Sequence, residues 1–569
     1  MTELQPIAET GTQILKYANN RMSSMKEIYI VPEPKRLSFD DQWFTFTGFQ
    51  NLPQFLAREF NVPKGEWKIT KTERKGTGLK IKDKEVTIWG DEQIAYATIL
   101  QLIKQRTRYL PEVEIEEKLK FGFRGYHLDI ARGGVPTIKT FNKILRWLFL
   151  LKYNYFAIYY EDLYPWKKHP KLGAHRGRLT EEELKEVTEY GEKLGIEVFP
   201  SLELAGHTEH TLTLPEYRQF SEWHRPQEGC LDLSNEKARE FAYELLTETA
   251  ENTRSRYIHI GGDETWALGR GESLSKTWKF EGPRLYELHH RKMIEIVKKA
   301  GKRPILWGDM ISGMYLRGES EKWGEALESP IWKEVLVANW DYSPSPKRHF
   351  IDKIEIFRKG GIQQIACPGL SNWNRYYPNF QMALENIKNF LTAARETDLP
   401  GFLITAWGDD GEECLFSLLE PLLLASMEIA EGNGEWQQKW KTITGEDKSM
   451  LKARVLFGDP TISEGLKHVI LRDFWFNRST GDAREEMKDK WEKTLEQIEG
   501  THLPGDLDLI RRMLEVGIEV LRNNAGVSDY IALSNSYSRL WLAERKPEGL
   551  ERIVKRFWGV AGRTDLRLC

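Results

Sequence analysis

Cysteine is scarce in this 569-residue sequence, and long apolar runs are missing. The four cysteines, Cys230, Cys367, Cys414 and Cys569, are widely spaced and form no CxxC pair, which argues against a disulfide framework and a thiolate zinc site. No run approaches the ~20 apolar residues that cross a bilayer, and Met1–Met25 lacks the basic start and apolar stretch of a secretory signal. We therefore expect a cytoplasmic protein that does not bind membranes.

A strong excess of one charge is also missing. Lys and Arg number 82, Asp and Glu number 85, and the net charge is −3, so the chain has no general attraction for nucleic acid. At roughly 150 residues per domain the length predicts about three to four structural units, or fewer if one is a barrel. Aromatic residues are abundant, with 20 Trp, 21 Tyr and 25 Phe. We expect most of them to pack in the core and the others to offer flat faces to a ligand.

Residues 1–118 have the pattern of a small α/β domain. Tyr29–Pro32 is predicted to form a strand, Leu79–Ile81 and Val86–Trp89 a hairpin, and Glu92–Arg106 an amphipathic helix. We find no residues there that suggest chemistry.

Residues 119–412 alternate short β-rich runs with helix-length segments, as parallel βα units do. A capping box, Thr180 with Glu183, marks the start of one helix. Eight such runs predict a closed (β/α)₈ TIM barrel, an α/β fold, and residues 413–569 predict a helical C-terminal domain. The runs begin near Arg124, Tyr155, Glu197, Tyr257, Arg303, Val335, Gln363 and Phe402, and the C-terminal helices are predicted at Cys414–Glu431, Leu507–Asn523, Tyr530–Ala543 and Glu548–Phe557.

Charged and aromatic residues end nearly every predicted barrel strand, and in a parallel barrel these ends open on one face. The sharpest signal follows the fourth strand, where His259–Glu264 reads HIGGDE. Side chains alternate along a strand, so Asp263 and Glu264 both reach a pocket only if the strand breaks, which the two glycines permit. A crowded carboxylate pair suits acid-assisted bond cleavage. A helix cap plus a solvated Glu is the plainer interpretation of the same residues.

The HIGGDE segment resembles the H-x-G-G-D-E signature of glycoside hydrolase family 20, the β-N-acetylhexosaminidases, and other segments agree. RGYHLDIAR at Arg124–Arg132 is similar to the first-strand motif of this family, Gly206–His207 to its G-H, and Ala406–Asp409 to its final Trp-x-Glu, with Asp in place of Glu. The segment Tyr160–Pro165 and the helical C-terminal part resemble the hexosaminidase D-like branch.

The resemblance implies a substrate-assisted retaining reaction, an exception to the two-carboxylate scheme. The nucleophile would be the substrate's 2-acetamido oxygen. Glu264 would protonate the leaving oxygen and later activate water, while Asp263 would hold the acetamido N–H and stabilise the oxazolinium intermediate. A tyrosine would donate to the amide carbonyl. Tyr342, at the end of the sixth strand, is the first candidate, and the alternative is Tyr376 or Tyr377, because many members of the family supply this residue from the seventh strand.

The remaining expected contacts surround one sugar. Trp307, Trp340, Trp373 and Trp407 end four successive strands and would wall the subsite, although each is also a candidate for core packing. Arg124 would bind the 3- and 4-hydroxyls or, alternatively, form a salt bridge beneath the barrel. Asp409 would receive the 4- or 6-hydroxyl, and Asp162 with His207 would form a buried pair that tunes Glu264, unless His207 is purely structural.

The resulting hypothesis is an exo-β-N-acetylhexosaminidase that acts on terminal GlcNAc or GalNAc of oligosaccharides or glycoconjugates, as a monomer or homodimer. A catalytically silent sugar-binding protein on the same barrel is the alternative. His207-x-x-His210 could be read as a metal pair, but it lacks the HExxH pattern. The glycine-rich segments lack a nucleotide-binding context, and we expect neither a metal nor a cofactor.

Overall fold

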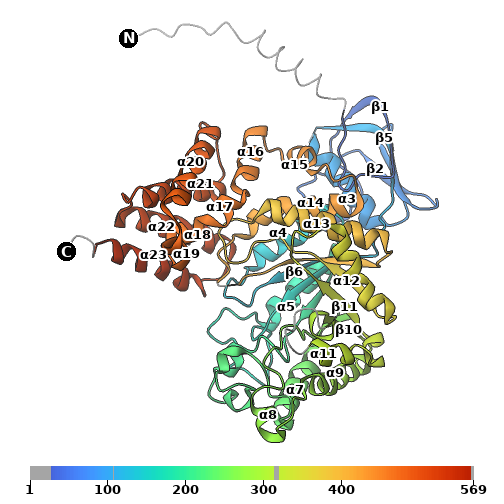
Figure 1. Cartoon of the computed structure of the whole chain (residues 1–569). Coiled ribbons are helices and arrows are strands. Elements are labelled where there is room, and N and C mark those ends of the chain that lie inside the picture. Colours follow the sequence, from blue (N-terminus) through green and yellow to red (C-terminus); the bar gives the residue numbers. More distant parts are fainter. Residues whose placement is uncertain (1–26, 107, 313–319, 410, 566–569) are drawn as a thin grey trace. The chain divides into compact units, whose positions relative to one another are not determined.

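The computed structural model describes the chain apart from residues 1–26, 107, 313–319, 410 and 566–569, so the predictions for Met1–Met25 and for Cys569 fall outside the described residues (Figure 1). The chain divides into two compact units. The first comprises Met1–Lys118 with Gln438–Gly445, and the second comprises Leu119–Gln437 with Glu446–Cys569.

The first unit contains a five-stranded sheet that packs against a helix. Its strand order is β1-β5-β3-β4-β2, and α3 contacts β3, β4 and β5. The predicted hairpin and helix are present. The elements are β1 (Arg36–Thr45), α2 (Gln54–Glu59), β2 (Lys68–Lys71), β3 (Thr77–Lys82), β4 (Glu85–Trp89), α3 (Glu92–Gln105) and β5 (Tyr109–Glu117), while α15 (Trp436–Thr444) belongs largely to this unit.

The strand predicted at Tyr29–Pro32 is wrong, because its backbone pairs with side chains and not with a neighbouring strand. The N–H of Val31 donates to Oε1 of Gln101 at 2.8 Å, and Nε2 of Gln101 donates back to the Val31 carbonyl at 2.7 Å. The side chain of Gln105 forms the same reciprocal pair of hydrogen bonds with the backbone N–H and carbonyl of Tyr29. Two glutamines one helical turn apart on α3 thus supply the hydrogen bonds that the backbone N–H and carbonyl groups of this extended segment need.

The second unit contains the predicted barrel. Eight parallel strands close in the order β10-β11-β12-β13-β6-β7-β8-β9, and each predicted run contains one of them. Strand β6 is buried along its whole length, as expected for strands covered on both faces. The strands are β6 (Phe123–Asp129), β7 (Tyr155–Tyr159), β8 (Glu197–Ser201), β9 (Tyr257–His259), β10 (Arg303–Trp307), β11 (Leu336–Trp340), β12 (Gln363–Cys367) and β13 (Gly401–Ala406).

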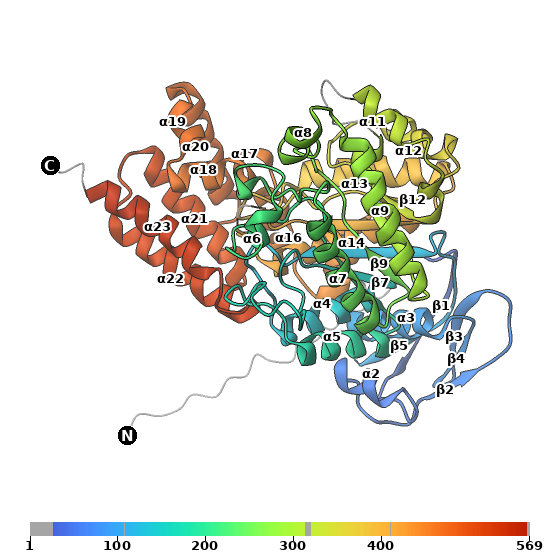
Figure 2. The same cartoon turned by 90° about the horizontal axis from the view of Figure 1, so that it is seen from below.

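Helices follow the strands and cover the barrel, and Figure 2 shows α4 beside α5 and α7 beside α9. The Thr180–Glu183 capping box starts α5 as predicted. These helices are α4 (Ile138–Leu150), α5 (Glu181–Lys193), α6 (Glu209–Leu212), α7 (Glu236–Asn252), α8 (Glu272–Thr277), α9 (Gly282–Lys299), α10 (Asp309–Ser312), α11 (Ser320–Ala326), α12 (Lys347–Lys359), α13 (Phe380–Glu396) and α14 (Glu420–Glu431).

Aromatic rings fill the interior of the barrel near the N-terminal ends of the strands. Phe123 stacks on Tyr155 with centroids 4.0 Å apart, and Tyr257 packs edge-on against both rings. Because this end is closed by side chains, a ligand can enter only from the C-terminal ends.

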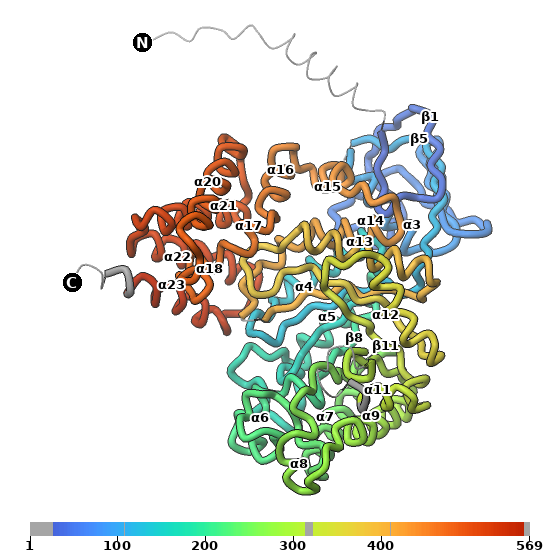
Figure 3. The backbone as a smooth tube through the Cα atoms, viewed as in Figure 1, coloured from blue at the N-terminus to red at the C-terminus, as the bar shows by residue number. Residues whose placement is uncertain are grey.

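The C-terminal helices lie in the same compact unit as the barrel, and Figure 3 traces α20 to α23 as a group of neighbouring helices. The predicted helices are present, the first beginning with a 3₁₀ turn at Phe416–Leu419. Among the described helices, none is long and apolar enough to cross a membrane. The helices are α16 (Lys448–Phe457), α17 (Pro460–Ser463), α18 (Gly465–Leu471), α19 (Phe474–Arg478), α20 (Gly481–Gln497), α21 (Gly505–Leu521), α22 (Val527–Glu544) and α23 (Leu550–Asp565).

Candidate active site

The chain breaks from strand geometry directly after β9. Gly261 has φ 67°, Gly262 has φ 98°, and Glu264 itself has φ 45°. A Cβ on Gly262 would lie 2.5 Å from Oη of Tyr286 and 2.8 Å from Nε2 of His290, so only glycine fits there. The break turns the two adjacent carboxylates, Asp263 and Glu264, into the same pocket.

This pocket opens at the C-terminal ends of the barrel strands and has a volume of about 210 Å³. Its side chains follow six different strands, so residues far apart in sequence converge as predicted. The lining residues are Arg132 after β6, His207 after β8, Asp263 and Glu264 after β9, Trp340 and Tyr342 at the end of β11, Trp373 after β12, and Trp407 and Asp409 after β13.

A histidine lies between the two carboxylates. Nε2 of His207 is 3.5 Å from Oδ2 of Asp263 and 3.5 Å from Oε2 of Glu264. Burial opposes the charge on His207, but the two carboxylates outweigh it and raise the pKa of the imidazole well above its ordinary value. Burial likewise opposes the charge on Asp263, yet His207 lowers the pKa of that carboxyl. The pair is therefore an ionised carboxylate beside an imidazolium.

The two oxygens of Asp263 have different surroundings. Oδ2 lies beside His207, whereas Oδ1 is buried and accepts no N–H. The carboxyl of Glu203 also shares a hydrogen bond with Asp263, so the side chain that lines the pocket is held from two sides.

A second buried carboxylate, Asp309, lies behind the acid. Its Oδ2 accepts the backbone N–H of Glu264 at 2.9 Å, and its Oδ1 accepts the indole N–H of Trp340 at 3.1 Å. Burial, reinforced by the charge of Asp263, raises the pKa of Asp309 to about 7. The Asp309 side chain thus fixes both the backbone of Glu264 and the indole ring of Trp340.

The aromatic wall is held by its own contacts. Trp340 stacks on Tyr342 with centroids 5.1 Å apart, and Tyr342 lies 5.1 Å from Trp373. Nε1 of Trp407 donates to the hydroxyl oxygen of Tyr342 at 2.7 Å. Because that oxygen accepts from Trp407, the phenolic proton of Tyr342 can be donated to a ligand.

Comparison with known proteins assigns this barrel to a family. Residues 121–345 match the model of the glycosyl hydrolase family 20 catalytic domain. Over these residues the barrel is similar to the family 20 glycosyl hydrolase domain. The chain is 26% identical over 285 residues to the beta-hexosaminidase subunit beta of Entamoeba histolytica, and the match covers 43% of this chain and 47% of that protein. It is 24% identical over 299 residues to hexosaminidase D of Bos taurus, covering 49% of this chain and 83% of that protein.

The solved structures show the same fold. The chitobiase of Flavobacterium johnsoniae superimposes with a TM-score of 0.57 at 18% identity, over 93% of this chain and 99% of that one. The chain therefore spans about half of the first curated relative and nearly all of this structural neighbour.

The predicted arginine contact is corrected by the structure. Arg124 lies at the start of β6, where its Nε donates to the Lys152 carbonyl at 2.8 Å and its Nη1 to the Phe121 carbonyl at 2.6 Å. Arg124 therefore bonds backbone carbonyls at the closed, N-terminal end of the barrel and does not reach the pocket. The arginine in the pocket is Arg132, whose Nη1 lies 2.8 Å from Oδ2 of Asp129 and whose Nη2 lies 3.1 Å from Oε1 of Glu161.

Three other predicted contacts lie outside the pocket. Asp162 pairs with Arg176 and not with His207. Trp307 is fully buried below the pocket, 4.3 Å from His259 and 5.8 Å from Trp407 by ring centroids. Tyr376 is buried against Phe557 and Tyr537 of the C-terminal helices, so Tyr342 is the tyrosine that the pocket contains.

Four charged residues at or beside the pocket were not predicted from the sequence. They are Arg132, Asp309, Glu161 and Glu203. Arg132 ends the first-strand motif and Asp309 follows the fifth strand, so the rule that strand ends converge would have selected both. Glu161 and Glu203 lie in the second and third runs. Oε2 of Glu203 accepts the Gly262 N–H at 3.2 Å, and burial raises its pKa well above the ordinary value.

Among the described residues, one group has the spacing of a metal site. Ligand atoms of Glu161, Glu209 and His210 all lie within 4.8 Å of one another. The Arg132 guanidinium already pairs with Glu161, and the positive charge of Arg176 lowers the pKa of His210, second to burial. A cation there would face two guanidinium groups, so we assign no metal, and a reaction without cofactors stays a prediction.

Proposed function

We propose that the chain is an exo-acting β-N-acetylhexosaminidase that hydrolyses terminal β-linked N-acetylglucosamine or N-acetylgalactosamine. The observation that carries this proposal is the pair of carboxylates, Asp263 and Glu264, that line one pocket on either side of His207. Asp263 would accept the 2-acetamido N–H of the substrate. The small pocket, closed beneath by packed aromatic rings, has room for one sugar at the end of a chain.

In the first step, the acetamido oxygen of the substrate forms a bond to the anomeric carbon. The bond from that carbon to the leaving oxygen breaks, and the leaving oxygen takes the proton of Glu264. Asp263, ionised because of His207, stabilises the positive charge of the oxazolinium. The phenolic proton of Tyr342 would bond to the acetamido oxygen.

In the second step, water attacks the anomeric carbon and gives its proton to Glu264. The bond to the acetamido oxygen breaks, and the sugar leaves with its configuration retained. Arg132 presents a fixed fork of donors to the ring hydroxyls. Asp129 and Glu161 orient that fork, and Asp409, 3.7 Å from Nη2 of Arg132, would accept a further hydroxyl.

Glu264→Gln tests this proposal. The variant should lose about 10²–10⁴-fold in kcat on amino sugars with poor leaving groups, because it has no proton to give. Glu272→Gln, on the exposed part of α8, should keep full activity. The measurement compares the two β-linked nitrophenyl amino sugars with the nitrophenyl β-glucoside, which lacks the amide. Equal cleavage of the glucoside by the unaltered protein would refute the substrate-assisted step.

No feature of the pocket favours the alternative of a silent sugar-binding protein, because a binding site alone has no use for Glu264. We further propose a cytoplasmic location. It is supported by three buried, unpaired cysteines, Cys230, Cys367 and Cys414, since secreted proteins more often pair theirs.

A further inference from the structure

Two buried side chains hold the backbone of the acid segment, Gly261–Glu264, by hydrogen bonds. Oδ2 of Asp309 accepts the Glu264 N–H at 2.9 Å. The hydroxyl of Tyr286, on α9, donates to the Gly262 carbonyl at 2.7 Å. Neither side chain lines the carboxylate pocket, so each can influence a bound sugar only through the backbone that it holds.

The two hydrogen bonds hold two consecutive peptide groups. The Gly262 carbonyl belongs to the peptide group that leads into Asp263, and the Glu264 N–H belongs to the next one. Gly261 and Gly262 both have positive φ values, and glycine has little conformational preference of its own. Because a peptide group is planar, fixing the Gly262 carbonyl also fixes the direction in which the chain enters Asp263.

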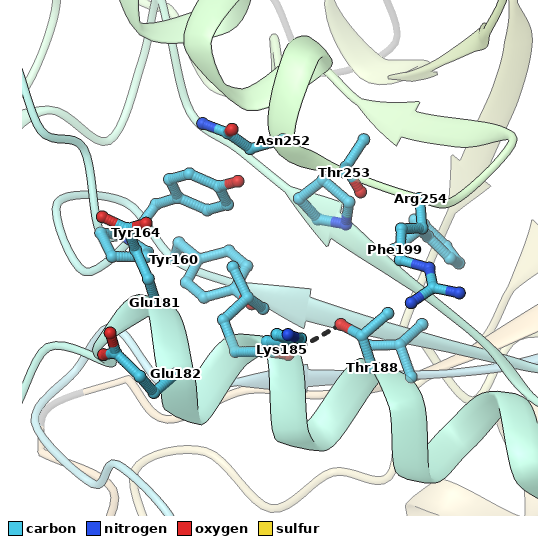
Figure 4. A pocket seen from close by; sticks show the side chains of 14 residues that line it. Tyr160, Tyr164, Glu181, Glu182, Lys185, Thr188, Phe199, Asn252, Thr253 and Arg254 are labelled. Atoms are coloured by element: carbon cyan, nitrogen blue, oxygen red, sulfur yellow. Dashed lines mark hydrogen bonds between the residues drawn. The ribbon is translucent and has the colours of Figure 1, made fainter.

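The Tyr286 side chain is itself immobile and protonated. It is fully buried, its ring stacks on His290 with centroids 3.8 Å apart, and it packs against Trp323 and Trp332 at 5.5 and 5.9 Å. Burial raises the pKa of Tyr286 well above its ordinary value, so the hydroxyl keeps its proton. A cavity of about 400 Å³ opens between α5 and the end of α7, but none of these residues lines it (Figure 4).

We propose that Tyr286 is a positioning residue, which orients Asp263 toward the 2-acetamido group of the substrate through the Gly262 carbonyl. This inference rests on the proposed function, because Asp263 has an amide to bind only if the substrate is an N-acetylhexosamine. Without the Tyr286 hydroxyl, the peptide group before Asp263 can rotate about the bonds that the glycines leave free. The Asp263 carboxylate then takes several orientations, while Asp309 still holds the backbone of Glu264.

Tyr286→Phe tests this inference, because it removes one oxygen and keeps the ring. We expect kcat to fall roughly five- to fiftyfold, as for a buried carbonyl that loses its donor. Asp263 acts on the acetamido group of every substrate, so the loss should be equal on dinitrophenyl and methylumbelliferyl N-acetylglucosaminides, whose leaving groups differ in acidity. The affinity for a thiazoline inhibitor, which copies the cyclised intermediate, should fall by a similar factor.

Tyr153→Phe is the matched control. Tyr153 is 3% exposed, precedes β7 at the closed end of the barrel, and donates its hydroxyl proton to the Leu423 carbonyl at 2.9 Å. Both variants lose a buried hydroxyl-to-carbonyl bond, so urea unfolding should show similar losses of stability. Tyr153→Phe should nevertheless keep its kcat and its thiazoline affinity. Glu264→Gln supplies the opposite kinetic pattern, a loss of kcat that grows as the leaving group becomes poorer.

Equal kcat values in Tyr286→Phe and Tyr153→Phe would overturn the inference. A loss in Tyr286→Phe that grows as the leaving group becomes poorer would also overturn it, because the disturbed group would then be Glu264. If Tyr286→Phe does not fold, the hydroxyl serves the fold as a whole and the inference is wrong. If the unaltered protein neither cleaves amino sugars nor binds the thiazoline, the proposed function is at fault and the inference falls with it.

Discussion

At the scale of single residues, Asp309 links the acid to the aromatic wall, and its protonation should be visible in stability. Its pKa rises from 3.8 to about 7 in the folded protein. The folded state therefore holds a proton that the unfolded chain releases near pH 4, and the free energy of unfolding falls as pH rises from about 4 to about 7, by about 1.4 kcal/mol per pKa unit.

Asp309→Asn removes this titration. Relative to the unaltered protein, the variant should gain stability steadily between pH 4 and 7, as measured by urea unfolding at several pH values. Asp40→Asn, on an exposed position of β1, serves as the control and should show no such trend. A stability difference between Asp309→Asn and the unaltered protein that is the same at every pH would contradict the assignment. Burial contributes most to the raised pKa of Asp309. The charges of Asp263 and Glu264 raise the pKa further, and the hydrogen bonds from the Glu264 N–H and the Trp340 indole lower it.

The two candidate tyrosines can also be separated at this scale. Tyr342→Phe removes a donor from the pocket and should raise the barrier by about 2–4 kcal/mol, the cost of losing an oxyanion-hole-like contact. Tyr376→Phe changes a ring packed against Phe557 and Tyr537 and should leave kcat unchanged. Steady-state kinetics on the nitrophenyl amino sugars decides between them, and equal losses in both variants would be evidence against Tyr342.

At the scale of elements, the break after β9 determines where the carboxylates point. Gly262→Ala would place a Cβ against Tyr286, His290 and Leu306, so both strain and overlap are expected. We predict a loss of about 2–5 kcal/mol in unfolding free energy, together with a lower kcat.

Gly301→Ala is the matched control for this change. Gly301 has φ 73°, but no atom lies within 4 Å of the added Cβ. It should lose only the ~1–2 kcal/mol of the left-handed conformation and keep its kcat. Thermal unfolding and initial rates on the two variants measure the difference, and similar kinetics for both would mean that the break does not orient the acid.

At the scale of the whole unit, the C-terminal helices support the rim of the pocket. Arg545, at the end of α22, is 1% exposed. Its Nη1 donates to the Glu412 carbonyl at 2.8 Å, and its Nη2 donates to the Cys414 carbonyl. Its guanidinium stacks on Phe416 at 4.1 Å. These contacts fix the segment that follows β13 and carries Trp407 and Asp409.

Arg545→Met should therefore lower the unfolding free energy by about 2–4 kcal/mol and raise KM more than it lowers kcat. Arg539→Met, on an exposed position of the same helix, should change neither. Urea unfolding and steady-state kinetics test this, and a normal KM in a destabilised Arg545 variant would show that the helices support only the fold.

The sequence by itself determined the number and order of the barrel strands, the capping box of α5 and the position of the carboxylate pair. These features depend on local patterns: runs of apolar residues, a Thr and Glu three apart, and two glycines that let a strand end. It also predicted most of the aromatic wall, because residues at the ends of parallel strands converge on one face.

Only the tertiary structure decided which arginine, tyrosine and buried carboxylates belong to the pocket. Arg124 is the second residue of β6 and Asp129 is the last, so they are separated by about 17 Å at ~3.3 Å per residue. That length places Arg124 at the closed end and Arg132 in the pocket. Tyr342 and Tyr376 likewise follow neighbouring strands, and only packing against the C-terminal helices turns Tyr376 away. Such choices depend on contacts between residues distant in sequence, which no local pattern records.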